Sequence, residues 1–513
     1  MGKYGKGKMV YFFVCFLIVF SGCSQEKTIG IGDSPKKDKK MTLAFPWSPQ
    51  RLDPHGSDSW EVMRTGTGET LVKLDEDLQV NPWLAKEWTQ EDATTWRFKL
   101  EENVSFHNGK AMDASSVKNS LLRSIEKDPK VKDLLNIETI EVVSAHELKI
   151  ATVQANAALI PHLADPSTMI ADISTIDDEN RYPALTGAFS FKQFKKDESL
   201  VVERFEDYWG EQALLSEVII KYIPEGTTRL MSLQSGDVDG ATDIPIDNMA
   251  VLEKDEKFEV YVTPSLRTHM LMFNMNSPFF KELALRKVVD LNTPRKEIVQ
   301  SIMLNAGTEA KSPFPEVFSF GNVTKLEPSL SSSELLEKAG WKKNEEGIWE
   351  RQGTIFDVTL FTFPQRPELT VMAEVIQSEL LKQGIKVSIR QVENIDEALM
   401  YEDWDLSMYS MLTAHTGDPQ YFLSMFYQSS SESNISNYES PIVDQKINEL
   451  NETPDRAKRD QLAIEIQDLI INDVPQSFIV HPKTVFSAKK GVEGFTPHPI
   501  EYYYIHSQLD ISK

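Results

Sequence analysis

The distribution of cysteine constrains this chain more than any other feature. Its two cysteines, Cys15 and Cys23, both lie within the first 23 of 513 residues. The rest of the chain has no thiol, so its fold depends neither on disulfides nor on cysteine-bound metals. With 41% hydrophobic residues, the body has enough apolar side chains for a sizeable core. Its length predicts more than one domain, because a single core rarely exceeds about 250–300 residues.

The N-terminal segment accounts for both cysteines. Three lysines precede an apolar run at 9–20, which is shorter than the ~20 residues of a spanning helix and typical of a secretory leader. Residues 21–22 are small and stand directly before Cys23. This order resembles a bacterial lipobox, although Phe20 stands in place of an aliphatic residue. The resemblance implies a signal peptide at 1–22, a lipidated (palmitate-bearing) Cys23 and an extracytoplasmic body; the alternative is an uncleaved membrane anchor.

The body alternates strand-like and helix-like segments. Residues 356–363 have the pattern of a strand, 369–384 that of a helix and 385–392 that of a second strand. Such a β-α-β succession predicts a parallel sheet with a crossover helix, and therefore an α/β fold. Asp113 is a predicted N-cap for a helix that begins at the next residue. The lysine-rich segment 23–40 is predicted to be a flexible tether.

Composition and missing motifs narrow the function. A formal net charge of -24 repels phosphate backbones, so we expect no nucleic-acid partner. The sequence contains no HExxH, GxSxG or Walker motif and no GxGxxG after a strand, which favours a binding protein over an enzyme. No two of its nine histidines have the i,i+4 spacing of a helical metal pair.

Eight segments resemble, in order, the solute-binding proteins of peptide and nickel ABC importers (bacterial solute-binding protein family 5). They are 52–55 (LDPH), 81–88 (NPWLAKEW), 96–114 (from WRFKL to DA), 207–210 (DYWG), 229–239 (ending LQSGDVD), 273–274 (FN), 335–341 (LLEKAGW) and 418–423 (DP with FL). The segment at 81–88 is similar to the nickel-binding branch in particular.

This resemblance implies a two-lobe, periplasmic-binding-protein-like fold with a hinge and an interlobe cleft. Lobe one is expected at 41–265 plus 482–513, enlarged by a subdomain at about 76–185, and lobe two at 266–481. Such proteins close around a solute and deliver it to a permease and ATPase. We expect a monomer, anchored in the cell membrane by lipid, with no cofactor other than a possible metal chelate carried as ligand.

Two departures from the family pattern bear on the ligand. Peptide-binding members usually carry an Asp three residues before the Asp-Pro, where it neutralises the peptide's ammonium group; this chain has His415. A neutral imidazole does not supply that charge. Nickel-binding members have an Arg between two prolines, whereas segment 165–168 (DPST) has none.

The resemblance places candidate ligand residues on both lobes. Trp60 and Met63 are expected at the cleft on lobe one, and the expected residues on lobe two are Arg267, His269, Thr413 and His415. Arg267 is suited to a ligand carboxylate, because guanidinium binds carboxylates bidentately; its alternative role is an ion pair. His269 and His415 suit a metal already wrapped by a small chelator; their alternative role is structural.

The sequence therefore predicts a solute-binding lipoprotein of an ABC importer whose ligand is a nickel chelate or a short peptide. Two alternatives stay open. One is a peptide-binding protein without metal, and the other is a receptor or adhesin that reuses the fold.

Overall fold

The computed structural model describes residues 38–176, 182–323 and 330–512. Its contacts group 39–513 into one unit and separate 1–38 from it. The predicted leader, Cys23 and nearly all of the tether 23–40 thus lie outside the described residues. No helix in the described ranges is long and apolar enough to cross a membrane. We keep the names lobe one (41–265 plus 482–513) and lobe two (266–481) for the residue sets predicted from the sequence.

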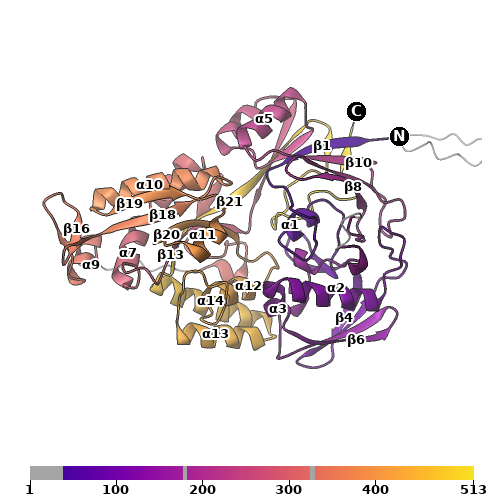
Figure 1. Cartoon of the computed structure of the whole chain (residues 1–513), viewed down its shortest axis with the longest axis horizontal. Coiled ribbons are helices and arrows are strands. Elements are labelled where there is room, and N and C mark those ends of the chain that lie inside the picture. Colours follow the sequence, from indigo (N-terminus) through magenta and orange to yellow (C-terminus); the bar gives the residue numbers. More distant parts are fainter. Residues whose placement is uncertain (1–37, 177–181, 324–329, 513) are drawn as a thin grey trace, which may run out of the picture. The chain divides into compact units, whose positions relative to one another are not determined.

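A twelve-stranded mixed sheet is the main element of the fold (Figure 1). Two of its strands, β12 (Phe258–Pro264) and β14 (Gly307–Glu309), pair with β21 beside the main path. The spatial order along that path is β19 (Lys386–Gln391), β18 (Asp357–Thr362), β20 (Leu406–Leu412), β13 (Arg267–Phe273), β21 (Gln476–Lys489), β11 (Gly240–Thr242), β1 (Lys40–Phe45), β10 (Glu217–Tyr222), β9 (Ser199–Arg204) and β8 (Phe189–Lys195).

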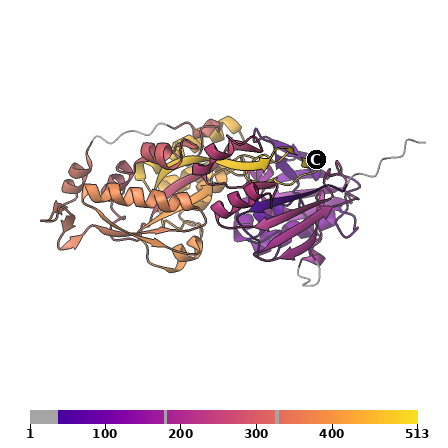
Figure 2. The same ribbon diagram turned by 90° about the horizontal axis from the view of Figure 1, so that it is seen from above.

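The long strand β21 belongs to both lobes. Its N-terminal part pairs with β13 and β14 in lobe two, and its C-terminal part pairs with β11 and β12 in lobe one. The strand runs from one lobe to the other in Figures 1 and 2, where it is yellow. The chain crosses between the lobes a second time between β12 and β13, at Ser265 and Leu266. These two neighbouring crossings form the connection about which the lobes can hinge.

A separate antiparallel sheet lies within the predicted subdomain of lobe one. Its strands are β4 (Ala85–Gln90), β5 (Thr95–Leu100), β7 (Glu147–Thr152) and β6 (Ile137–Ser144), in that order. Helix α2 (Ala114–Lys127) contacts β6 and β7, and α3 (Pro129–Leu135) follows it. The Asp113 side chain accepts a hydrogen bond from the Ser116 main chain at 2.8 Å, which confirms the predicted N-cap.

The predicted β-α-β unit of lobe two is confirmed. Strands β18 and β19 pair in parallel, and α10 (Pro367–Gln383) connects them. Gly384 ends the helix in the left-handed conformation (φ +89°), where a side chain would meet the Gly347 carbonyl.

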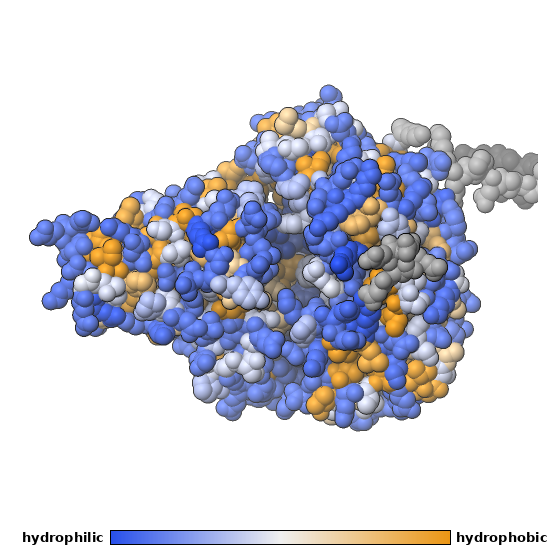
Figure 3. Space-filling model, in the orientation of Figure 1, coloured by the Kyte–Doolittle hydropathy of each residue, from blue (hydrophilic) through white to orange (hydrophobic). Residues whose placement is uncertain are grey.

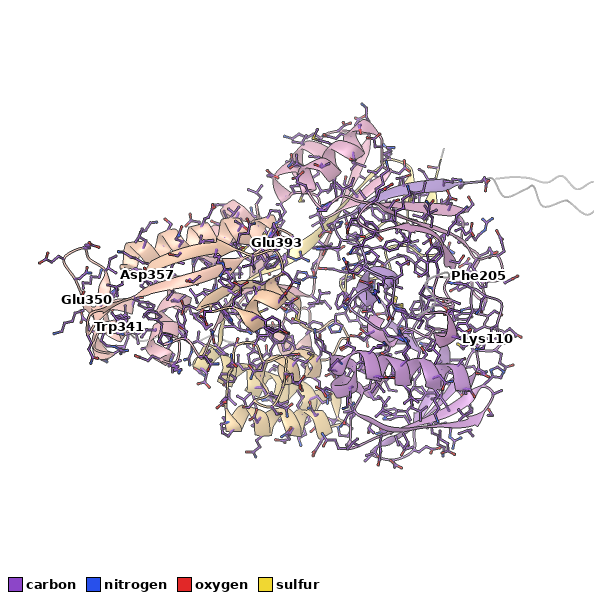
Figure 4. All side chains as sticks on the ribbon, viewed as in Figure 1. Lys110, Phe205, Trp341, Glu350, Asp357 and Glu393 are labelled. Atoms are coloured by element: carbon purple, nitrogen blue, oxygen red, sulfur yellow. The ribbon has the colours of Figure 1, made fainter. Side chains whose placement is uncertain are left out.

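The remaining elements are shorter or cover the sheets. The helices are α1 (Ser59–Met63), α4 (Leu159–His162), α5 (Gly226–Ser235), α6 (Met249–Leu252), α7 (Leu283–Leu291), α8 (Arg295–Glu297), α9 (Ser332–Lys338), α11 (Ile395–Tyr401), α12 (Gln420–Tyr427), α13 (Pro441–Glu452) and α14 (Arg456–Asp473). The small sheets are β2 (Val72–Leu74) with β3 (Val80–Pro82), β22 (Val492–Glu493) with β23 (Asp510–Ile511), and β15 (Lys342–Lys343), β16 (Trp349–Arg351) and β17 (Thr354–Ile355) together. Figure 4 shows Trp341 and Glu350 of this last region together, at the end of lobe two away from Lys110 and Phe205 of lobe one.

The DYWG segment is part of the scaffold of lobe one. Tyr208 Oη and Trp209 Nε1 donate hydrogen bonds to the two carboxyl oxygens of Glu69, at 2.7 and 2.9 Å. Glu69 is buried. Burial raises its pKa to about 7, because the hydrogen bonds that favour the ionised form do not offset the loss of hydration. The aromatic pair therefore fixes a buried acid rather than a solute.

The raised pKa of Glu69 makes the stability of the folded protein depend on pH. With a folded-state pKa near 7 and an ordinary pKa of 4.5, Glu69 binds a proton in the folded state that the unfolded chain lacks between those pH values. The contribution of this bound proton to the free energy of unfolding is therefore complete below about pH 4.5 and is lost as the pH rises through 7. Glu69→Gln, which stays neutral, should gain stability relative to the parent between pH 5 and pH 8, by about 3 kcal/mol at most. Melting temperatures of both proteins across this range test it, and a constant difference would contradict it.

Candidate functional site

Arg267 begins β13 at the crossing between the lobes, where it is already paired. Its Nη2 and Nε donate to the two carboxyl oxygens of Glu501, at 2.7 and 3.0 Å, and Ser265 Oγ donates to the same carboxylate at 2.7 Å. Both members of the pair are buried. Burial alone would raise the pKa of Glu501, but the Arg267 guanidinium holds it far below its usual range. A solute carboxylate would have to displace Glu501 to reach Arg267, so the ion-pair role weighed above is the one seen here.

His269 lies two residues along the same strand and shares a partner with Arg267. Its Nδ1 is 2.9 Å from Ser410 Oγ on β20, while Arg267 Nη1 donates to that same hydroxyl at 3.3 Å. The other nitrogen, Nε2, is buried without a hydrogen bond and lies 3.5 Å from Glu368 Oε1. Burial, with help from nearby Arg366 and Arg267, lowers the pKa of His269 well below its usual value. The imidazole is therefore neutral, the form that binds metals.

Arg366 and Glu368 were not predicted from the sequence. They stand at the start of α10, directly after strand β18. The Arg366 guanidinium lies 5.3 Å from the ring centre of Trp47 in lobe one, and its Nη1 is 3.9 Å from Glu368. Within the described residues it makes no hydrogen bond, so it is available to a carboxylate. A signal was present in the sequence, because ligands of α/β proteins commonly bind at the carboxyl ends of parallel strands.

A small pocket of about 10 Å³, room for roughly one water molecule or one ammonium-sized group, lies on the lobe-one side of Trp47. Its lining residues are Phe45, Pro46, Trp47, Glu61, Arg64, Tyr222, Thr242, Asp243 and Tyr504. Since Arg366 packs over Trp47, the pocket adjoins residues of lobe two. The space-filling view shows the surface hollowed near its centre, where the two lobes meet (Figure 3).

His415 lies in a second cluster that joins the lobes. Its Nε2 donates to Asp165 Oδ2 at 2.7 Å, and both residues are buried. The ring also contacts Trp60 and Tyr421, with ring centres 5.3 and 4.2 Å apart. Thus the two segments that depart from the family pattern, the His415 loop and 165–168, contact one another. A neighbouring contact between His162 and Thr416, at 3.1 Å, supports the same junction.

The other two predicted residues lie elsewhere. Met63 is buried in the core of lobe one. Thr413 is also buried and donates to the Pro313 carbonyl, as does Thr268. Because neighbouring strand residues face opposite ways, Thr268 points away from Arg267 and His269, and Thr413 lies on that far side.

The six predicted residues therefore divide into groups. Arg267 and His269 share Ser410, and the Trp60 ring contacts His415 at a tilt of 50°, but no contact joins His269 to His415. Among the described residues, no three His, Cys, Asp or Glu side chains could hold a metal ion together. A metal in this cleft would need most of its ligands from a chelator.

Comparison with known proteins gives consistent matches. Residues 79–434 match bacterial extracellular solute-binding proteins, family 5 (middle region). The nickel-binding protein NikA of Staphylococcus aureus is 28% identical over 97% of this chain and 98% of its own length. Its crystal structure with Ni(L-His)2 has a TM-score of 0.84 and covers 92% of this chain and 100% of that one.

Two further structures are similar. A nickel ABC transporter protein from Bacillus halodurans is 31% identical, with a TM-score of 0.72, over 92% of this chain and 100% of its own. DppA from Helicobacter pylori, solved with the peptide STSA, is 21% identical, with a TM-score of 0.80, over 92% of this chain and 98% of its own. At that identity the last match supports the fold alone.

The two arginines should respond differently to substitution. Arg267→Gln leaves Glu501 buried without its cation, so the free energy of unfolding should fall by about 3–5 kcal/mol. Arg366→Gln removes no hydrogen bond within the described residues and should cost less than about 1 kcal/mol. Urea unfolding of both variants and the parent measures this. Equal losses would contradict the assignment of Arg267 to the scaffold.

Proposed function

Because this chain belongs to the bacterial extracellular solute-binding proteins, family 5, we propose that its solute is a nickel chelate of a small carboxylate-bearing molecule. Members of the family are binding proteins, not enzymes. They act outside the cytoplasm and deliver their solute to an ABC importer, which consists of a permease and an ATPase. This chain accordingly captures a solute for import.

The arrangement of groups around His269 favours a chelated metal as the solute. In lobe two, the buried and neutral His269 presents an unpartnered Nε2 beside Glu368, and the guanidinium of Arg366, held only by its contacts with Glu368 and Trp47, lies next to them. An imidazole nitrogen suits Ni²⁺, and a guanidinium suits the carboxylate of its chelator. The protein alone supplies too few ligands in the described residues, which fits a metal that arrives already chelated. Nickel-binding relatives support the same solute.

The contact between His415 and Asp165 weighs against ordinary peptides. The loop position that carries a free carboxylate in peptide-binding members holds an imidazole, and that imidazole is already bonded to Asp165. Neither group is therefore free to hold a peptide's ammonium group there.

Calorimetry should separate these solutes. We expect the parent to bind nickel premixed with L-histidine, and His269→Ala to weaken this binding at least about tenfold, or 1.4 kcal/mol. His146→Ala is the matched control, because His146 lies between β6 and β7 in the subdomain, and it should bind as the parent does. A pool of metal-free di- and tripeptides is the second titrant. If the parent binds peptides and His269→Ala changes nothing, the solute is a peptide and the nickel proposal is wrong.

We also propose that the protein is a lipoprotein held in the membrane through Cys23. The lipobox-like order at 21–23 and the short apolar run before it support this. Anchoring would keep the binding protein near its permease.

Cys23→Ala should remove the lipid and change where the protein is found. In cell fractions washed with carbonate, the parent should remain with the membranes, whereas most of the variant should be released. Cys15→Ala is the control, since Cys15 lies within the leader, and it should fractionate like the parent. A variant at position 23 that resists the wash would favour the uncleaved anchor.

A further inference from the structure

The pocket beside Trp47 is lined by two carboxylates with few partners. Asp243 makes no side-chain hydrogen bond within the described residues, and Glu61 has only Arg64 Nη1, at 3.5 Å. Arg64 is itself engaged, because its Nε donates to the Glu501 carbonyl at 3.0 Å and it lies over the Tyr504 ring. These two acids line the same pocket, and both are partly exposed there.

The lobe-two side adds one acid and one cation. Arg366, over Trp47, is separated from Glu368 by 3.9 Å, which is longer than a hydrogen bond. Behind Glu368 lies the buried Nε2 of His269, which has no hydrogen-bond partner. An unpartnered, buried nitrogen aimed at this acid is a second sign that the cleft is built for a missing group.

The charges around the cleft do not cancel. Arg267 and Glu501 neutralise each other. That leaves the carboxylates of Glu61, Asp243 and Glu368 against the guanidiniums of Arg64 and Arg366, an excess of one negative charge. Two further charged groups nearby, Asp58 and Arg229, carry opposite charges and leave this excess unchanged. Asp58 accepts three main-chain N–H groups, and Arg229 donates to main-chain carbonyls.

An excess negative charge in a partly desolvated cleft favours a positive group of the solute. A positive charge near a carboxylate is attracted more strongly in a partly desolvated cleft than in bulk water, because the effective dielectric constant is lower there. Burial raises the pKa of both Glu61 and Glu368, so each acid would gain from a cation as neighbour. A solute with only negative groups would find Arg366 but would be repelled by the acids.

We propose that Glu61 and Asp243 form a subsite for a positively charged group of the solute, opposite Arg366, which takes its carboxylate. The positive group is either the ammonium group of an amino acid or the net positive charge of a metal chelate. This inference rests on the proposed function in one respect: it assumes that the solute binds in the cleft. It adds that the solute carries both signs of charge and is not a net anion.

Neutral variants of the two acids test the subsite. Asp243 has a φ of +50°, a conformation that Asn adopts as readily as Asp, so Asp243→Asn keeps the backbone unstrained. Glu61→Gln keeps the size of the side chain. Asp247→Asn is the matched control, because Asp247 is an exposed acid in the same lobe whose side chain accepts a hydrogen bond from Asn248.

Three probes are titrated calorimetrically into the parent and each variant: nickel with one equivalent of L-histidine (net positive), L-histidine alone (an ammonium group) and nickel–citrate (net anionic). We expect Asp243→Asn and Glu61→Gln to weaken nickel–histidine binding at least about tenfold, without weakening nickel–citrate. Asp247→Asn should stay within about twofold of the parent. Salt should weaken the parent's binding of nickel–histidine more than that of Asp243→Asn. If a variant fails to fold, the parent alone still tests the subsite: salt should weaken its binding of nickel–histidine, and binding that salt leaves unchanged would contradict the subsite.

The outcomes separate the two proposals. If nickel–histidine binding depends on His269 but not on Glu61 or Asp243, the subsite is wrong and the nickel proposal stands. If L-histidine alone binds and Asp243→Asn weakens it while nickel adds nothing, the subsite stands, its cation is an ammonium group, and the nickel proposal fails. Binding of nickel–histidine that requires both sets of residues supports both proposals.

Discussion

Strand β21 is the structural element on which the rest of the arrangement depends. Its fourteen residues pair with strands of both lobes, so one continuous sheet carries the chain across the cleft. No disulfide is available to hold this junction, because the body has no cysteine. Instead, the buried pair of Arg267 and Glu501 ties the start of β13 to the C-terminal segment of lobe one. The residues that line the cleft on either side are positioned relative to this connection.

Charged groups in the cleft divide into those that serve the fold and those that are left over. Arg267, Glu501, Asp58 and Arg229 have their hydrogen bonds satisfied by the protein. Arg366, Asp243 and Nε2 of His269 do not, within the described residues. Buried polar groups are nearly always paired, so the buried, unpartnered Nε2 of His269 supports the proposal that a solute binds here, beside the partly exposed Arg366 and Asp243. Residue type alone does not distinguish the paired groups from the unpaired ones, because each set contains an arginine and a carboxylate.

Local patterns were predictable from the sequence, and long-range partners were not. The strand, helix and strand at 356–392 and the Asp113 cap depend on periodicity and on hydrogen bonds within a few residues, and both are confirmed. The partner of Arg267 is 234 residues away, and that of His415 is 250 residues away. No spacing in a single sequence reveals such pairs. Arg366 was not predicted for another reason: it follows a predicted strand, but it lies outside the eight segments that resemble the family.

The contact between Asp165 and His415 also constrains how this protein can change over time. Each residue is buried, and each is the other's hydrogen-bonding partner across the two lobes. Replacing one alone leaves an unpaired polar group in the junction, whereas replacing both can be nearly neutral. The two positions therefore form an epistatic unit: a lineage that moves between the family's patterns at these sites must change them together or pass through a less stable intermediate. Although they are far apart in the sequence, the two sites should co-vary among relatives.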